Sequence, residues 1–405
     1  MKKRKIAVFT GNRAEYGLQF PILKAIAEHP KLDYCLIVSG AHLDKNFGNT
    51  LIEIEKDGFN IHAEIKIDMD TNHHGTSQAI GSGILSISKI LYELKPDIMV
   101  VYADRFEGFA AVIAASQMNI PTAHIEGGDI TEGGALDDSV RHAMTKLSHI
   151  HFTTNSQASN RILSMGEESW RVHTVGFPAI DLLSQGNYAS PIEIIKKLKL
   201  DLSKPIILFT QHSVTTEFNE ASSQLKPSLL AIEDLSKDDL QVICTYPNND
   251  AGGKSIIMDL KKFSKKKIKG LQLHQSLGRY IYHGVLALAI KRNHRVVCVG
   301  NSSSGIKETP FFGCPTVNIG SRQEGRLRGQ NVIDTDYNRK EIKSAIEKCL
   351  YNENFRKKSE KTENPYYIGN TGIKIANKLA SINLGKKILR KKMTIKGKEK
   401  NGWYQ

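Results

Sequence analysis

Acidic residues cluster behind predicted strands in the first half of this 405-residue chain. Asp104 follows the run 98–102, Glu126 precedes two glycines behind another run, and Asp137 opens a predicted helix. Removing a proton from a carbon needs a positioned base, and returning one needs an acid. Crowded carboxylates shift each other's pKa, which can separate these two roles. The pattern therefore predicts acid–base catalysis, and helix capping is the plainer interpretation of Asp104 and Asp137.

Several histidines accompany the carboxylates: His42, His124, His142, His149 and His151. Histidine and carboxylate side chains could instead bind a metal ion. The spacings contain neither HExxH nor CxxC, so we expect no required metal and no cofactor. Serine-nucleophile chemistry is not expected either, because the GxSxG turn is absent.

A glycine and three serines follow a predicted strand in the second half, as Val299-Gly300-Asn301-Ser302-Ser303-Ser304. A strand that runs through such residues into a helix offers hydroxyls and N–H groups to a phosphate, which Ser302 and Ser303 would contact. Glu308 cannot favour phosphate, but it suits a ribose diol, whose two hydroxyls can donate to one carboxylate. A serine-rich helix N-cap is the plainer alternative.

Arginines supply further candidate phosphate contacts. Arg13 lies in the predicted strand-to-helix turn 10–17, and the glycine-bounded loop 320–329 holds three arginines, among them Arg322. Arginine binds phosphate oxygens with paired N–H groups. The turn lacks the GxGxxG pattern of dinucleotide-binding proteins, and a simple turn with a surface arginine is the alternative.

Strand and helix patterns alternate along the chain, which favours parallel sheets covered on both faces. The predicted strands are 5–10, 34–39, 61–67, 98–102, 122–125, 150–153, 206–210, 241–245, 271–274, 295–299 and 316–319. The predicted helices are 14–28, 47–56, 76–94, 106–117, 138–147, 217–233, 253–263, 277–290, 304–312 and 371–382. Open parallel sheets bind ligands at the carboxyl ends of their strands. We expect an α/β protein whose two doubly wound domains face each other across a ligand cleft.

The predicted domains span residues 1–185 and 205–370, with the glycine- and proline-containing stretch 186–204 as the linker. A C-terminal helix over 371–385 is expected to pack back toward the first domain. The tail 386–405 has eight Lys and Arg against one Glu, and so carries +7 of the net charge of +14. Such runs are usually solvated and disordered chain ends.

Composition narrows the function classes. The mildly basic body fits an enzyme that attracts a diphosphate, and no aromatic–basic pattern suggests nucleic acid. The five cysteines are scattered, and no apolar run approaches a membrane span. We expect a cytoplasmic protein that does not contact membranes.

Together these motifs resemble the UDP-N-acetylglucosamine 2-epimerases. The resemblance rests, in order, on TGNRAEYG (10–17), ADRFE (103–107), HIEGGD (124–129), LDDSVRH (136–142), QHS (211–213), YPNNDAGG (246–253), GNSSSGIKE (300–308) and GSRQEGRLRGQNVI (320–333). It implies a GT-B-like fold, two Rossmann-like domains with the active site between them. The segment Asn12–Gly17 is similar to the branch that hydrolyses its substrate to free N-acetylmannosamine and UDP.

The resemblance also implies a mechanism: anti elimination of UDP to a 2-acetamidoglucal, followed by hydration. Asp104, Glu126 and Asp137 would be the acid and base groups, and which of them removes the C2 proton stays open. His42 would lie near the sugar, and Arg13 and Arg105 near the sugar or phosphates. The residues expected to hold UDP are His212, Asn248, Ser302, Ser303, Glu308 and Arg322.

This sequence departs from the family pattern in places. Ser213 stands where the family often has proline, and the basic tail has no counterpart that we recognise. These departures leave the exact sugar open. UDP-GlcNAc is the first candidate substrate, and UDP-N,N'-diacetylbacillosamine, on the way to legionaminic acid, is the second. A non-hydrolysing epimerase and a GT-B glycosyltransferase are further alternatives. The family implies a homodimer or homotetramer.

Overall fold

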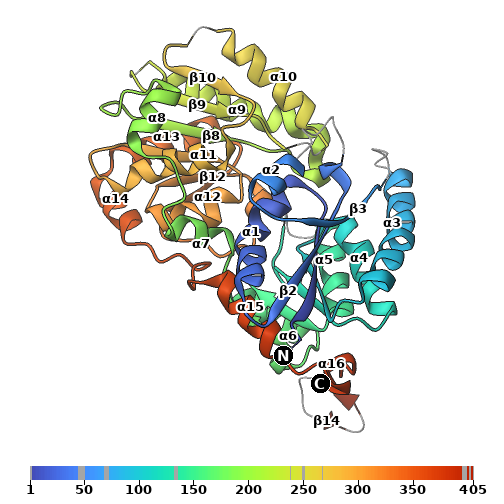
Figure 1. Cartoon of the computed structure of the whole chain (residues 1–405). Coiled ribbons are helices and arrows are strands. Elements are labelled where there is room, and N and C mark those ends of the chain that lie inside the picture. Colours follow the sequence, from blue (N-terminus) through green and yellow to red (C-terminus); the bar gives the residue numbers. More distant parts are fainter. Residues whose placement is uncertain are drawn as a thin grey trace. The chain divides into compact units, whose positions relative to one another are not determined.

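The computed structural model describes all residues except 1, 44–50, 68–72, 132–135, 238, 249–250, 267, 395–398, 401–402 and 405. The chain forms two compact units (Figure 1). Unit 1 comprises residues 1–130, 136–182 and 368–405, and unit 2 comprises residues 131–135 and 183–367. Within the described residues, no helix is long and apolar enough to cross a membrane.

Unit 1 is built on a parallel sheet with the strand order β3-β2-β1-β4-β5-β6-β7. The strands are β1 (Arg4–Thr10), β2 (Leu32–Ser39), β3 (Ile61–Ile65), β4 (Ile98–Tyr102), β5 (Thr122–Ile125), β6 (Ile150–Thr153) and β7 (Val172–Thr174). The helices are α1 (Arg13–Glu28), α2 (Leu51–Lys56), α3 (His73–Leu94), α4 (Phe106–Gln117), α5 (Leu136–Leu147), α6 (Ser156–Ser164), α15 (Thr371–Ser381) and α16 (Lys386–Leu389), and α7 (Ala179–Ser184) begins in unit 1 and ends in unit 2. A short antiparallel pair, β14 (Glu399–Lys400) and β15 (Trp403–Tyr404), ends the chain.

Successive residues of β1 point to opposite faces of this sheet, as strand geometry requires. Ile6 and Val8 pack in one buried cluster with α1 and α15, while Ala7 and Phe9 pack in another with α3 and α4. Helices thus cover both faces, which explains the continuous apolar runs in the strands.

Unit 2 repeats this design with the order β10-β9-β8-β11-β12-β13. The strands are β8 (Ile206–Thr210), β9 (Gln241–Thr245), β10 (Leu271–His274), β11 (Val296–Gly300), β12 (Thr316–Ile319) and β13 (Val332–Thr335). The helices are α8 (Pro191–Leu198), α9 (Ala221–Leu235), α10 (Gly253–Ser264), α11 (Gly278–Ala287), α12 (Ser304–Lys307), α13 (Arg339–Tyr351) and α14 (Glu353–Glu360). Both sheets have the Rossmann strand order, so the predicted class of two doubly wound α/β domains is confirmed.

Two segments differ from the sequence-based expectations. The stretch expected to be a linker contains α8, which has a Ser190–Glu193 capping box and buries Ile194 and Leu198 in the core of unit 2. The tail expected to be disordered is held in place over residues 386–394, although most of its side chains are exposed, because Ile388 is fully buried in the core of unit 1 and neighbouring carbonyls are bound by Arg171.

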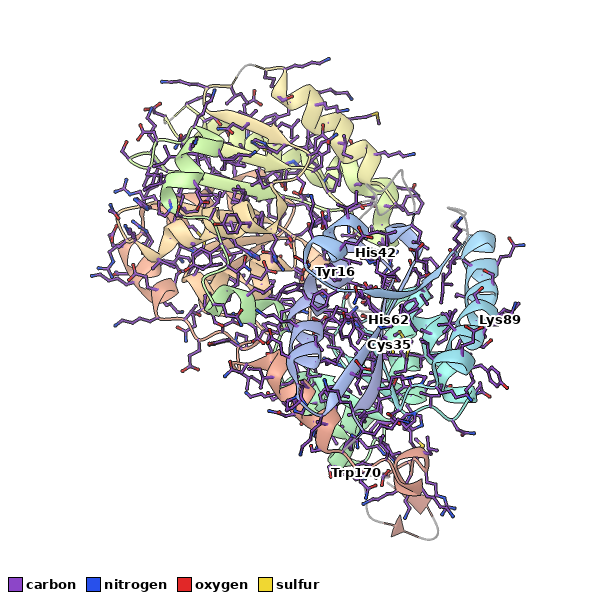
Figure 2. The ribbon with its side chains drawn as sticks, viewed as in Figure 1. Tyr16, Cys35, His42, His62, Lys89 and Trp170 are labelled. Atoms are coloured by element: carbon purple, nitrogen blue, oxygen red, sulfur yellow. The ribbon has the colours of Figure 1, made fainter. Side chains whose placement is uncertain are left out.

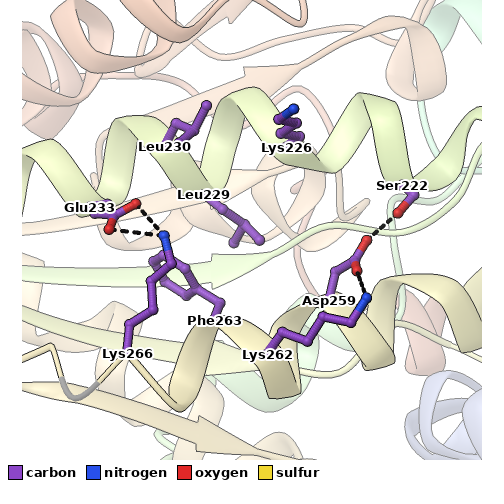
Figure 3. A pocket seen from close by; sticks show the side chains of 9 residues that line it. All are labelled: Ser222, Lys226, Leu229, Leu230, Glu233, Asp259, Lys262, Phe263 and Lys266. Carbon is purple, nitrogen blue, oxygen red and sulfur yellow. Dashed lines mark hydrogen bonds and ion pairs between the residues drawn. The ribbon is translucent and has the colours of Figure 1, made fainter.

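A groove of about 380 Å³ runs between α9 and α10 of unit 2 (Figure 3). Leu229 and Phe263 form its apolar floor, and the ion pairs Lys266–Glu233 and Lys262–Asp259 lie along its sides. None of the predicted site residues lines it.

Candidate active site

Two neighbouring strands of unit 1 end in strained turns. Ala103 directly follows β4 and has φ +53°, and Glu126 directly follows β5 and has φ +60°. L-residues rarely adopt this left-handed conformation, and it persists where the surroundings enforce it, often at functional sites. The strands are paired in parallel, with Tyr102 opposite Ile125, so both turns lie at one edge of the sheet.

Glu126 is held by a tyrosine from the adjacent strand. The Tyr102 hydroxyl donates to Glu126 Oε1 at 2.5 Å, and both side chains are buried. Burial, followed by the nearby Glu126 carboxylate, raises the pKa of Tyr102 well above its ordinary value. The phenol therefore keeps its proton and orients Glu126.

Asp104 is held differently, by a buried arginine on α5. Arg141 Nη2 donates to Asp104 Oδ2, and Arg141 Nη1 donates to Asp138 Oδ1 at 3.5 Å. Paired with a guanidinium, the Asp104 carboxylate is stabilised in its charged form. Asp137 lies in the first turn of the same helix and is half-buried.

His42 lies behind β2 in a short 3₁₀ turn, Gly40–His42, and its side chain is fully buried. Its Nε2 is 3.1 Å from Thr10 Oγ1, and its ring meets the Tyr16 ring edge to face at 6.3 Å (Figure 2). Burial lowers the pKa of His42 to about 4. The imidazole is therefore neutral at physiological pH.

The sequence analysis missed two acids in this region. Glu107 in the first turn of α4 is fully buried, and neither of its carboxyl oxygens has a hydrogen-bond partner among the described residues. Arg105 Nε lies 3.7 Å from Glu107 Oε2. Burial, with the charge of Asp137 a lesser cause, raises the pKa of Glu107. Burial thus favours the protonated form of this carboxyl group, and the nearby Arg105 guanidinium opposes that effect.

Glu15 is the second of these acids. It accepts a 2.7 Å hydrogen bond from the Gly11 N–H, and burial and then the charge of Glu107 raise its pKa to about 8. Gly11 and Gly40, in the turns behind β1 and β2, were the sequence signal for a side chain packed against these turns. A Cβ on Gly40 would lie 3.0 Å from Glu107 Oε1, so the glycine leaves room for that acid.

The second group of predicted residues surrounds the end of β11 in unit 2. Asn301 Oδ1 accepts from the His212 N–H at 2.7 Å, and Asn301 Nδ2 donates to the His212 carbonyl at 2.9 Å. The N–H of Asn248 donates to His212 Nδ1 at 3.0 Å, and Arg322 donates to the Asn301 carbonyl at 3.2 Å. Burial, followed by the charge of Arg322, lowers the pKa of His212 to about 3. His212 is thus a neutral, fixed acceptor.

Gly300 allows this turn to form. Its φ is +128°, and a Cβ there would lie 1.9 Å from the Thr210 carbonyl oxygen. Only glycine permits this approach of the β8 and β11 ends.

Glu308 lies beyond the serine-rich turn, where Ser302 and Ser303 are half-buried. Its Oε2 accepts from His283 Nε2 at 2.9 Å and from Ser304 Oγ at 2.5 Å. Burial acts to raise the pKa of Glu308, but His283 and Ser304 outweigh it, and the net pKa is lowered. His283, on α11, was missed because its link to Glu308 is tertiary. The predicted helix 304–312 is in fact α12 followed by a 3₁₀ turn, Thr309–Phe312.

The structure therefore gathers the predicted residues in two sets. Asp104, Arg105, Glu126, Asp137 and His42 belong to unit 1, and His212, Asn248, Ser302, Ser303, Glu308 and Arg322 belong to unit 2. Arg13 begins α1, and its side chain lies outside the described part of the chain. Ser213 is fully buried, and its hydroxyl has no partner among the described residues.

Fold and side chains together define an α/β enzyme with two Rossmann-like domains and GT-B-like architecture. A sequence model described as UDP-N-acetylglucosamine 2-epimerase matches residues 24–380, so the chain belongs to that family and is a UDP-sugar 2-epimerase.

Individual proteins agree with this assignment. The hydrolysing UDP-N,N'-diacetylbacillosamine 2-epimerase of Legionella pneumophila is 33% identical over 96% of this chain and 98% of its own. A UDP-N-acetylglucosamine 2-epimerase of Neisseria meningitidis is 34% identical over 85% and 87%. The crystal structure of UDP-GlcNAc 2-epimerase from Neisseria meningitidis bound to UDP-GlcNAc has a TM-score of 0.77 at 19% identity, over 93% of this chain and 99% of that one. The last likeness supports the fold alone.

Proposed function

We propose that this enzyme is a hydrolysing 2-epimerase that converts a UDP-linked 2-acetamido sugar and water to UDP and the free 2-epimer. The observation that carries the proposal is the pair of acids at adjacent strand ends. Glu126 is buried against a neutral tyrosine, while Asp104 is paired with Arg141. Two carboxyl groups in unlike environments suit a reaction that removes a proton from one face of a carbon and adds one to the other.

The proposed reaction has two steps. First, a carboxylate takes the C2 proton, the C2–H electrons form the C1–C2 double bond, and the C1–O bond to UDP breaks. Then water gives a proton to a carboxylate as its oxygen bonds to C1, and a carboxylic acid protonates C2 from the opposite face. Asp104, Glu126 and Asp137 are the candidate acid and base groups, and neutral His42 is placed to contact the sugar.

In this proposal the residues of unit 2 take the nucleotide end of the substrate. Ser302, Ser303 and Arg322 would donate to the diphosphate, and Glu308 would accept from the ribose hydroxyls. His283 and Ser304 keep Glu308 ionised and oriented for that role. UDP leaves without a covalent enzyme intermediate.

UDP-N,N'-diacetylbacillosamine is our first candidate substrate. The Legionella relative that bears this activity in its name aligns over nearly the whole of both chains. UDP-GlcNAc is the second candidate, favoured by the shorter alignment to the Neisseria meningitidis enzyme. The two sugars differ at C4 and C6. In UDP-N,N'-diacetylbacillosamine C4 carries an acetamido group and C6 is a methyl group, whereas in UDP-GlcNAc both carbons carry hydroxyls.

Rates of UDP release from the two sugars, measured side by side, test the proposal. The proposal predicts at least tenfold higher kcat/KM for UDP-N,N'-diacetylbacillosamine, and release that needs no acceptor sugar. Release that requires an acceptor would instead indicate a glycosyltransferase. Loss of turnover in Glu126→Gln would separate the epimerase from that alternative, which has no use for Glu126.

A further inference from the structure

The basic C-terminal segment is built into unit 1. Residues 385–394, the C-terminal strap, begin at α16, whose Ile388 is fully buried in the core. The Thr394 N–H donates to the Gly166 carbonyl at 2.8 Å. A Cβ on Gly166 would lie 2.9 Å from Met393 Cγ, so this glycine allows the strap to approach.

Arg171 anchors the strap with three hydrogen bonds to its carbonyls and makes two more to Glu168 and His149. Its Nη groups donate to the carbonyls of Lys387 (3.2 Å), Ile388 (2.8 Å), Arg390 (3.1 Å) and His149 (3.1 Å). Its Nε donates to Glu168 Oε2 at 2.8 Å. The guanidinium is fully buried and stacks on Trp170, whose place is labelled in Figure 2, with 4.2 Å to the ring centroid.

Lys391 connects the strap to the end of α5. Its ammonium donates to the carbonyls of Lys146 at 2.7 Å and Ser148 at 2.5 Å, and lies 3.3 Å from that of Thr145. It also pairs with the buried Glu167 at 2.9 Å. A cation at a helix C-terminus satisfies the last carbonyls and complements the helix dipole. The first turns of the same helix carry Asp137 and Arg141.

A second route leads from Lys391 to the strained turn before Asp104. The Thr145 hydroxyl donates to His124 Nδ1 at 3.1 Å, and His124 Nε2 donates to the Ala103 carbonyl at 2.7 Å. Burial lowers the pKa of His124 to about 3, so the ring is neutral and takes one donor and one acceptor role. His124 also lies two residues before Glu126.

We infer that Lys391 is a positioning residue for the active site and that the C-terminal strap is part of the catalytic unit. The strap fixes the end of α5 and, through Thr145 and His124, the turn that presents Asp104. This inference rests on the proposed function, because it assigns Asp104 and Glu126 to the chemistry.

The test compares Lys391→Met and Thr145→Val with the control Lys392→Met. Lys392 lies next along the strap and its side chain is exposed, so the control removes the same charge without touching α5. Both test variants should lower kcat for UDP release roughly tenfold or more, because small misplacements of catalytic groups have large effects on rate. The Kd and stoichiometry of UDP binding should stay within twofold of wild type, since unit 2 is unchanged.

Hydrogen exchange supplies a readout that needs no substrate. Lys391→Met should speed exchange in peptides covering 136–147 and 102–106, and Thr145→Val in 102–106, while Lys392→Met should change neither. Wild-type kcat together with wild-type exchange in both test variants would overturn the inference. If the wild-type enzyme released no UDP from any 2-acetamido sugar nucleotide, the proposed function would fail, and the exchange data would still decide the role of the strap.

Discussion

The Tyr102 hydroxyl lies 2.5 Å from Glu126 Oε1, across two neighbouring strands and within the buried interior. A hydrogen bond to a charged acceptor contributes about 1.5–3 kcal/mol. We therefore expect Tyr102→Phe to lower kcat by roughly 10- to 100-fold with little change in KM, because the loss falls on the acid–base group. Steady-state kinetics check this prediction. Tyr92→Phe, on an exposed tyrosine, is the control, and equal kinetics for both variants would remove Tyr102 from the site.

Ionisation of Glu15 should make stability depend on pH. Burial and then the charge of Glu107 raise its pKa in the folded protein to about 8, from an ordinary value of 4.5. Between these values the native state binds more protons than the unfolded state, so this contribution to stability is lost as pH rises through 8.

Glu15→Gln cannot ionise, so relative to wild type it should gain about 2 kcal/mol or more between pH 5 and pH 8.5, at about 1.4 kcal/mol per pKa unit. Urea unfolding at the two pH values measures the difference. Glu28→Gln on the exposed end of the same helix should track wild type. Parallel pH profiles for Glu15→Gln and wild type would show that Glu15 ionises normally.

Gly300 should tolerate no side chain. A Cβ there would lie 1.9 Å from a backbone oxygen, so Gly300→Ala must displace the end of β8 or β11 and should cost about 3 kcal/mol or more. Gly58 also has a positive φ, +82°, but a Cβ there meets nothing within 4 Å. Gly58→Ala should therefore show the conformational cost alone, about 1 kcal/mol. Denaturation measures the loss of stability in each variant, and UDP titration measures its affinity. Unchanged UDP affinity in Gly300→Ala would contradict the proposed role of the serine-rich turn after Gly300 in phosphate binding.

Glu308 should recognise the ribose. Glu308→Gln should weaken UDP binding roughly 10- to 100-fold, because a charged hydrogen-bond acceptor is lost. The same substitution should hardly change the affinity for 2',3'-dideoxy-UDP, which lacks both hydroxyls. Calorimetric titration of both nucleotides into wild type and Glu308→Gln gives the interaction free energy between Glu308 and the ribose hydroxyls. An equal loss for the two nucleotides would assign Glu308 to structure instead.

The sequence predicts the framework of the site well, for a physical reason. Residues directly behind parallel strands meet at one edge of a sheet, so Asp104 and Glu126 could be placed from the strand pattern alone. Their partners could not, because Tyr102 reaches Glu126 through strand pairing and Arg141 reaches Asp104 through helix packing. The same holds for His283, which reaches Glu308 from a separate helix. From the sequence alone, Glu15 and Glu107 resemble ordinary exposed acids in the first turn of a helix. Only the structure shows that they are buried next to Gly11 and Gly40.

The tail shows the opposite error. Eight basic residues predict a disordered, solvated end, and most side chains of residues 386–394 are indeed exposed. The backbone is nevertheless held in place, because composition says nothing of hydrogen-bonding partners elsewhere in the chain. Here helix carbonyls and Glu167 accept from Lys391, while Arg171 binds the backbone of the strap. The stretch expected to be a linker is likewise folded, and the Ser190–Glu193 capping box was its readable signal.

Proton NMR of the reaction in D₂O tests the central claim most directly. The account predicts UDP and a free sugar inverted at C2, with solvent deuterium at C2 in every product molecule, because the C2 hydrogen leaves in the elimination and a solvent-derived one enters in the hydration. A UDP-linked epimer without free sugar would contradict hydrolysis. Retention of protium at C2 in a free, epimerised sugar would contradict the elimination itself.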